Sequence, residues 1–208
     1  MEKILITGAS SGIGRELARN LVGRSRRMYL LARSEDKLNL LKKELEEKNS
    51  LLECVCIYNL TDTVNLESIT ENCDVDLVIN CAGIGKITDF LKLSDEEDLN
   101  TINVNFISPL ILTKKFSEKF LQAGKGIILN VCSTAALYQH TYMAIYSSVK
   151  SALLHYSLAL DEECGLDEKG KRMTCGTVVV PIEAGTRMER TKERAIQLAK
   201  MYDEIHKK

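Results

Sequence analysis

The chain has 208 residues, 45% of them hydrophobic, and a formal net charge of −1 at pH 7. This size and apolar content predict a single domain over residues 1–208. The near-neutral charge argues against nucleic acid or an anionic membrane surface as a partner. Seven scattered cysteines predict reduced, mostly buried thiols, and three distant histidines indicate no metal site. With no bilayer-spanning apolar run and no room for a signal peptide, we expect a soluble cytoplasmic protein.

Short apolar runs alternate with amphipathic segments along the first part of the chain. Strands are predicted at 3–7, 27–32, 51–58 and 76–80, and helices at 15–22, 35–48 and 60–72. Ser34 is placed to cap the second of these helices. The first strand runs straight into the glycine-rich segment Gly8-Ala-Ser-Ser-Gly-Ile-Gly14.

The second part of the chain continues the alternation. Ser94 and Glu97 are spaced as a capping box, which predicts a long helix that ends at Gly124 and bends near Pro109. A fifth strand at 126–132 precedes a helix from about Tyr146 to residue 160. A charged loop over 161–171, a sixth strand at 173–180 and a helical tail over 187–208 follow.

The alternation predicts parallel β-α-β units and a sheet covered by helices on both faces. We therefore expect an α/β fold of the doubly wound Rossmann type, with about six strands in the order 3-2-1-4-5-6. Ligands of such sheets bind beyond the carboxyl ends of the strands. Glycine, proline or polar residues occupy all six of these ends: Gly8, Arg33, Asn59, Asn80, Ser133 and Pro181.

Two groups of residues suggest chemistry at those strand ends. Glycines between a strand and a helix present free amides and a positive helix end to a phosphate. Tyr146 and Lys150 are spaced i, i+4, so they share one helix face, and Ser133 lies at a strand end nearby. Each group also has a plainer explanation. The glycines could serve only a turn that needs their conformational freedom. Tyr146 and Lys150 could be an ordinary amphipathic pair, and Ser133 could be a capping residue.

The ordered set of motifs resembles the short-chain dehydrogenase/reductase family over residues 3–188. Thr7-Gly-Ala-Ser-Ser-Gly-Ile-Gly14 resembles its T-G-x-x-x-G-I-G fingerprint, and Asn80-Cys-Ala-Gly83 resembles its N-N-A-G motif. Tyr146-Ser-Ser-Val-Lys150 matches Y-x-x-x-K. Asn105 and Ser133 match the asparagine and the serine of the family's catalytic tetrad. Residues 181–186 resemble the segment that holds the nicotinamide.

This resemblance implies a mechanism and a set of site residues. Tyr146 would donate the proton in carbonyl reduction, with its pKa lowered by Lys150 and by the positive nicotinamide. Lys150 would also bond the nicotinamide ribose, Ser133 would hold the substrate oxygen, and Asn105 would hold a water of the proton relay. Alternatively, Asn105 would only form hydrogen bonds with backbone groups at a helix bend. The implied cofactor-binding residues are Gly8, Ser10, Ser11, Gly12, Ile13, Gly14, Arg33, Asn59, Leu60, Asn80, Ala82, Gly83, Tyr146, Lys150, Pro181 and Thr186.

The end of the second strand bears on the choice of cofactor. An acidic residue there would bond a ribose 2′-hydroxyl, whereas an arginine accommodates a 2′-phosphate. The sequence has Arg33 at this position, and Ser10 and Arg15 are expected to assist it. NADP(H) is therefore the expected cofactor. NAD(H) remains an alternative, because Arg33 could instead stack on the adenine or be solvated.

Three features depart from the family pattern. Asn59 stands where an aspartate is usual, and Ile182 replaces a glycine. Thr186 keeps the family position, but a capping box with Glu189 is a competing explanation for it. The third departure is the length of the chain. No seventh strand is found, so the tail is expected to cover the active site as a lid or to cover the edge of the sixth strand. The family's helix-pairing dimer remains possible, and we expect a homodimer.

Three functions are compatible with these features. The first is an NADP(H)-dependent oxidoreductase acting on a small carbonyl or alcohol substrate. The second is a sensor or scaffold that binds NADP(H) with little or no turnover, which Ile182 and the short tail keep open. The third, a sugar-nucleotide epimerase, is disfavoured by the glycine spacing. The substrate pocket is expected to involve residues 135–143, where Tyr138 and Tyr142 lie, together with the tail.

Overall fold

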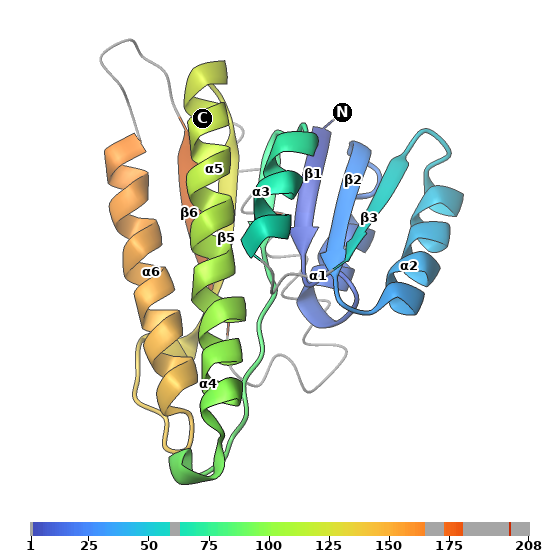
Figure 1. The fold of residues 1–208 in the computed structure, drawn as a ribbon. Coiled ribbons are helices and arrows are strands. Elements are labelled where there is room, and N and C mark those ends of the chain that lie inside the picture. Colours follow the sequence, from blue (N-terminus) through green and yellow to red (C-terminus); the bar gives the residue numbers. More distant parts are fainter. Residues whose placement is uncertain (1, 59–62, 165–172, 181–199, 201–208) are drawn as a thin grey trace.

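The computed structural model describes residues 2–58, 63–164, 173–180 and 200. Its centre is a six-stranded parallel sheet with the order β3-β2-β1-β4-β5-β6 (Figure 1). The predicted doubly wound fold and strand order are therefore confirmed. The strands are β1 (Glu2–Thr7), β2 (Ser25–Ala32), β3 (Glu53–Tyr58), β4 (Leu77–Asn80), β5 (Ile127–Ser133) and β6 (Thr174–Val180).

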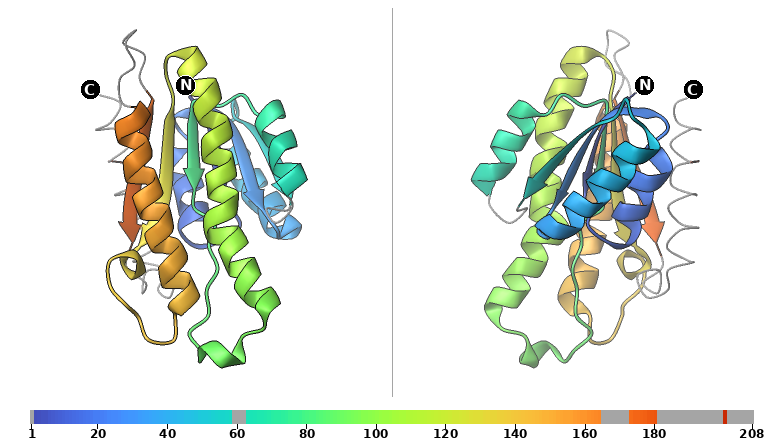
Figure 2. Two further views of the ribbon diagram at one scale, coloured as in Figure 1. Left: turned by 60° about the vertical axis from the view of Figure 1, so that its left-hand side comes forward. Right: turned by 90° about the vertical axis from the view of Figure 1, so that its right-hand side faces the viewer.

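Helices cover both faces of the sheet. The helices α1 (Gly12–Leu21) and α2 (Glu35–Lys48) lie on one face, and α3 (Thr63–Asn72), α5 (Ser108–Ala123) and α6 (Ala144–Cys164) lie on the other (Figure 2). Alternate residues of β1 pack against the helices on the two faces of the sheet, because successive side chains of a strand point to opposite faces. Ile4 and Ile6 pack with the α1 and α2 side, whereas Leu5 packs with Phe116 of α5.

The long helix predicted after residue 94 is interrupted near its middle. It consists of α4 (Asp95–Ile102), a π-helical turn (Asn103–Ile107) and α5. Pro109 lies in the first turn of α5 and has no N–H to donate, and the amide of Ser108 bonds the Asn103 carbonyl five residues back. The predicted bend is thus a local widening of the helix. The capping box of Ser94 and Glu97 is confirmed, as is the left-handed Gly124 at the end of α5.

One predicted capping bond is absent, and several helix and strand ends differ from the prediction. Ser34 occupies the N-cap position of α2, but its side chain makes no capping hydrogen bond. A charged loop was expected from residue 161, but α6 continues to Cys164. Asp161 turns towards the sheet, where it accepts a 2.9 Å hydrogen bond from the Cys175 amide. β2 begins two residues before its predicted start, and β3 begins two residues after its predicted start.

Some expectations fall on residues outside the described ranges. These are the cofactor residues Asn59, Leu60, Pro181 and Thr186, the loop 165–171 and most of the tail. Among the described residues there is no strand beyond β6, no cluster of metal ligands and no disulfide, and Cys54, Cys73, Cys132 and Cys175 are buried free thiols. The same residues include no helix that is long and apolar enough to cross a membrane.

Candidate active site

The glycine loop joins β1 to α1 under tight steric limits. Gly8 and Gly12 have φ values of +71° and +53°, a region that side chains other than glycine rarely adopt. A Cβ atom on Gly14 would lie 2.5 Å from the Gly8 carbonyl oxygen. The Thr7 hydroxyl accepts hydrogen bonds from the amides of Cys81 and Ala82, both at 3.0 Å. The loop is thereby held against the end of β4.

The amino end of α1 faces a large cleft at the carboxyl end of the sheet. Ser11 is in the N-cap position with an extended backbone and makes no side-chain capping bond. The amides of the first turn are therefore free of the usual intramolecular acceptor. The cleft has a volume of about 890 Å³. Its lining includes every described residue that the sequence predicted to bind the cofactor, with the exception of Asn80.

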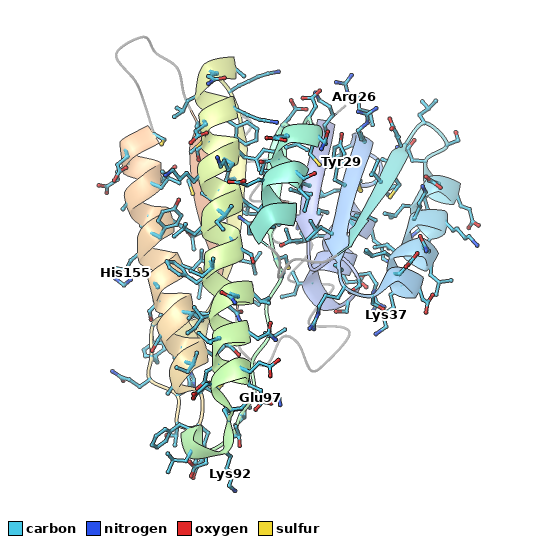
Figure 3. The ribbon with its side chains drawn as sticks, in the orientation of Figure 1. Arg26, Tyr29, Lys37, Lys92, Glu97 and His155 are labelled. Atoms are coloured by element: carbon cyan, nitrogen blue, oxygen red, sulfur yellow. The ribbon has the colours of Figure 1, made fainter. Side chains whose placement is uncertain are left out.

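The cleft suits a dinucleotide with an extra phosphate. The amino end of α1 is suited to an anion such as a pyrophosphate, and Arg33, Ser34 and Lys37 supply positive charge and a hydroxyl at the end of β2. Figure 3 shows Lys37 on α2, at the level where the strands end. The sequence analysis missed Lys37, although its position one turn beyond Arg33 was a usable signal. Arg15, by contrast, turns to Glu16, with Nε 3.7 Å from Oε1.

Three of the predicted catalytic residues converge on the floor of this cleft. The Lys150 side chain is buried, and its Nζ donates a 3.1 Å hydrogen bond to the Val131 carbonyl. The same Nζ lies 5.8 Å from the centre of the Tyr146 ring. Ser133 is buried at the end of β5, where its hydroxyl accepts a 3.2 Å hydrogen bond from the Ala135 amide, and its interaction with the Tyr146 phenol favours a lower Tyr146 pKa.

Asn105 lies behind this group, inside the π-helical turn. Its amide nitrogen donates to the carbonyls of Ile84 at 2.7 Å and Thr101 at 2.9 Å. Its Oδ1 is buried without a hydrogen-bond partner. A Cβ on Gly83 would lie 2.9 Å from this oxygen and 3.5 Å from Lys150 Nζ. The space between Asn105 and Lys150 therefore exists because residue 83 is glycine, and a buried acceptor without a partner calls for a donor such as water there.

The pKa of Tyr146 differs from the expectation drawn from the sequence. Burial raises it, and the hydrogen bond to Ser133 only partly opposes this effect. Burial also lowers the pKa of Lys150. The predicted lowering of the Tyr146 pKa is thus not produced by the chain alone, because both groups lose water and the Lys150 ammonium bonds a carbonyl rather than the phenol.

Asn80 has a different position from the other predicted cofactor residues. Its side-chain nitrogen donates to Thr113 Oγ1 at 3.1 Å and to Asn130 Oδ1 at 2.8 Å. Asn130 in turn donates to Ser157 Oγ at 2.8 Å. This buried network joins β4, β5, α5 and α6. Asn80 therefore fixes the sheet against the two helices, while the neighbouring Ala82 and Gly83 line the cleft.

A second cavity of about 590 Å³ lies on the other side of Tyr146. It lies between the loop over 84–93, the first turns of α4 and the start of α6. Of the segment 135–143, which was expected to form the substrate pocket, only 141–143 contribute. Its lining residues are Arg33, Ile84, Gly85, Lys86, Thr88, Asp89, Phe90, Leu93, Glu97, Asp98, Asn100, Thr101, Thr141, Tyr142, Met143, Ala144, Ile145 and Tyr146.

A parallel Rossmann-type sheet with a glycine loop, a tyrosine and a lysine at its carboxyl end defines a nucleotide-dependent oxidoreductase class. Comparison with known proteins makes this class specific. The family model described as short chain dehydrogenase matches residues 2–196. The chain therefore belongs to the short-chain dehydrogenase/reductase family.

Individual relatives agree with this assignment. A very-long-chain 3-oxoacyl-CoA reductase from Pyricularia oryzae is 32% identical over 76% of this chain and 50% of its own length. The NADP-dependent 3-hydroxy acid dehydrogenase from Schizosaccharomyces pombe is 31% identical over 77% of this chain and 64% of its own length. The chain thus spans about half to two thirds of the length of these curated relatives.

Solved structures share the fold at lower identity. The bulky-bulky ketone specific alcohol dehydrogenase from Comamonas testosteroni has a TM-score of 0.87 at 24% identity, covering 98% of this chain and 83% of its own. A short-chain dehydrogenase from Sphingobium yanoikuyae in complex with NADPH has a TM-score of 0.85 at 24% identity, covering 98% of this chain and 85% of its own.

Proposed function

We propose that the protein is an NADP(H)-dependent reductase of small carbonyl compounds that also catalyses the reverse alcohol oxidation. One observation supports this function above the others. Tyr146 forms part of the wall of both cavities, the cleft suited to a dinucleotide and the pocket beyond it. A proton donor between a cofactor site and a substrate site is what carbonyl reduction requires.

The side chains have distinct roles in this reaction. The cofactor, when bound, supplies the hydride that the carbonyl carbon receives. Tyr146 gives its phenolic proton to the carbonyl oxygen, which Ser133 holds by a hydrogen bond. Lys150 maintains positive charge beside the tyrosine, and Asn105 presents its buried oxygen towards the space next to Lys150. A water in that space would return a proton to the site.

The preference for NADP(H) rests on the end of β2. Arg33, Ser34 and Lys37 line the cleft there, and no carboxylate of the described chain does. Two cations and a hydroxyl favour a 2′-phosphate over a 2′-hydroxyl. The relative from Schizosaccharomyces pombe is named as NADP-dependent, which supports the same choice.

Replacing Tyr146 by phenylalanine tests the function directly. Turnover of aldehydes and ketones should fall by at least about 100-fold, since one general acid is lost, while NADPH affinity stays within about two-fold because the ring is retained. Tyr142→Phe is the matched control, since Tyr142 lines only the substrate-side pocket and should keep most activity. NADPH binding without turnover of any carbonyl compound by the unaltered protein would favour the sensor or scaffold alternative.

The broader assignments stay predictions. A single domain over 1–208, a cytoplasmic location and a homodimer are compatible with the described fold. Sedimentation would decide the oligomeric state.

A further inference from the structure

We propose that Asp98 determines the substrate class. The pocket beyond Tyr146 takes carbonyl compounds that carry a hydrogen-bond donor, a hydroxyl or a protonated amine, at the end remote from the carbonyl. Asp98 accepts that donor. This inference rests on the proposed function, because it assumes that the carbonyl group is held at Tyr146.

The walls of the pocket divide into apolar and polar parts. Ile84, Phe90, Leu93, Met143 and Ile145 provide an apolar lining. Such a lining favours a compact apolar body between the two ends of the substrate. The polar groups that remain decide its orientation and its specificity.

Most of the charged groups in this pocket already have partners. Lys86 forms an ion pair with Glu97, which Figure 3 shows on α4. Asp89 accepts a 3.0 Å hydrogen bond from the Leu91 amide. Arg33 is shared with the cleft, at the end of β2. Asp98 differs from these groups, because its Oδ1 is shielded from solvent and has no hydrogen-bond partner.

Interaction with the helix dipole does not explain why the Asp98 Oδ1 is shielded from solvent without a hydrogen-bond partner. Asp98 stands in the first turn of α4, where acidic residues interact well with the helix dipole. Asp95, Glu96 and Glu97 occupy the same turn, so that role is already filled. Asp95 is exposed and meets water, whereas Asp98 lines the pocket. A carboxylate oxygen that is removed from water without a partner is costly. Rotation of the half-buried Asp98 side chain turns this oxygen to the pocket that the residue lines, where the donor of a ligand relieves the cost.

The same charge predicts which substrates are rejected. A carboxylate at the remote end of the substrate would meet Asp98 as a like charge, with Lys86 already neutralised by Glu97. A methyl group there would leave the Asp98 oxygen unsatisfied. A hydroxyl satisfies the oxygen, and an ammonium group adds charge attraction. The expected order of preference is amine, hydroxyl, methyl and carboxylate.

The experiment uses four para-substituted benzylacetones that carry a methyl, hydroxymethyl, aminomethyl or carboxyl group on the ring. We expect kcat/KM for the aminomethyl compound to exceed that for the methyl compound by roughly 10- to 100-fold, the range for a hydrogen bond to a charged group. Asp98→Asn should abolish most of this advantage and leave the methyl compound within about three-fold. Asp95→Asn removes the same charge from the same helix turn and should change nothing.

A second measurement separates this inference from the proposed function. Calorimetric affinities of the four compounds for the protein, with and without NADP⁺, require no turnover. If no compound is turned over but the affinities show the same Asp98-dependent order, the proposed reductase function is refuted and the role of Asp98 in recognition is kept. Equal kcat/KM values and equal affinities for the aminomethyl and methyl compounds would overturn the role of Asp98, as would equal effects of the Asp98 and Asp95 variants.

Discussion

Substituting alanine for Gly83 tests whether the space between Asn105 and Lys150 serves catalysis. The added Cβ would lie 2.9 Å from Asn105 Oδ1, closer than ordinary van der Waals contact, and 3.5 Å from Lys150 Nζ. It would fill the space in which a water can satisfy the buried oxygen. A displacement of catalytic groups of up to about 1 Å costs on the order of 100-fold in rate. Overpacking of this kind costs about 1–3 kcal/mol of stability.

The expected result for Gly83→Ala is a kcat for ketone reduction that falls by roughly 10- to 100-fold, with a folded protein and a Kd for NADPH that changes much less. Stopped-flow turnover, fluorescence titration with NADPH and thermal melting provide the three readouts. Gly23→Ala is the control, because a Cβ at Gly23 meets no atom within 4 Å. A kcat within two-fold of the unaltered protein would show that the space has no role in proton transfer.

Three further substitutions probe other parts of the site and fold. Lys37→Ala should weaken NADPH binding by about 10-fold, the cost of one charge-assisted bond, and leave NADH within two-fold, as measured by fluorescence titration. Ser157→Ala leaves Asn130 Nδ2 without its hydroxyl acceptor and should cost about 1–3 kcal/mol in urea unfolding. The Arg19 guanidinium lowers the Glu44 pKa from 4.5 to about 2, so this pair stabilises the fold above pH 4.5 and the contribution is lost as the pH falls towards 2. Glu44→Gln should therefore cost about 1 kcal/mol or less at pH 7, given solvent screening, and the difference from the unaltered protein should vanish near pH 2.

The sequence predicts the fold well because two independent signals agree. Apolar runs such as 3–7 alternate with amphipathic helices, and glycine or polar residues terminate each strand. Parallel pairing then follows from the connections, since a helix between successive strands returns the chain to the same edge of the sheet. The six strands and their order match this expectation. Element ends were less predictable, because contacts such as Asp161 with the Cys175 amide depend on tertiary packing.

The path of the helix through Asn105 could be anticipated only in part. Pro109 predicts a disturbance, because it cannot donate to the helix ladder. Whether the helix kinks or widens depends on which carbonyl the flanking amides find. Here Ser108 bonds Asn103, and the resulting π-helical turn positions Asn105 with its nitrogen bonded to Ile84 and Thr101. Such turns are frequent at functional sites.

The pocket residues were the least predictable part of the site. Lys37 has one local signal, its place four residues after Arg33. Asp98 has none, because it belongs to a helical turn whose charged residues are equally suited to solvent. Three other acidic residues share the first turn of α4 with Asp98. Only the packing of α4 against the loop over 84–93 reveals that Glu97 and Asp98, rather than Asp95 and Glu96, line a cavity.

The pKa of Tyr146 separates what the chain does from what a cofactor adds. Burial raises it, so the cofactor-free site holds the phenol in its protonated form. Lys150 does not reverse this, because the same burial disfavours its own charged form and its ammonium bonds the Val131 carbonyl. A protonated phenol suits the proposed reduction, in which Tyr146 is the proton donor. The reverse oxidation needs the phenolate, and positive charge beside the ring, such as a bound oxidised nicotinamide carries, would favour that form. Reduction should therefore lose rate only as the pH rises through the Tyr146 pKa.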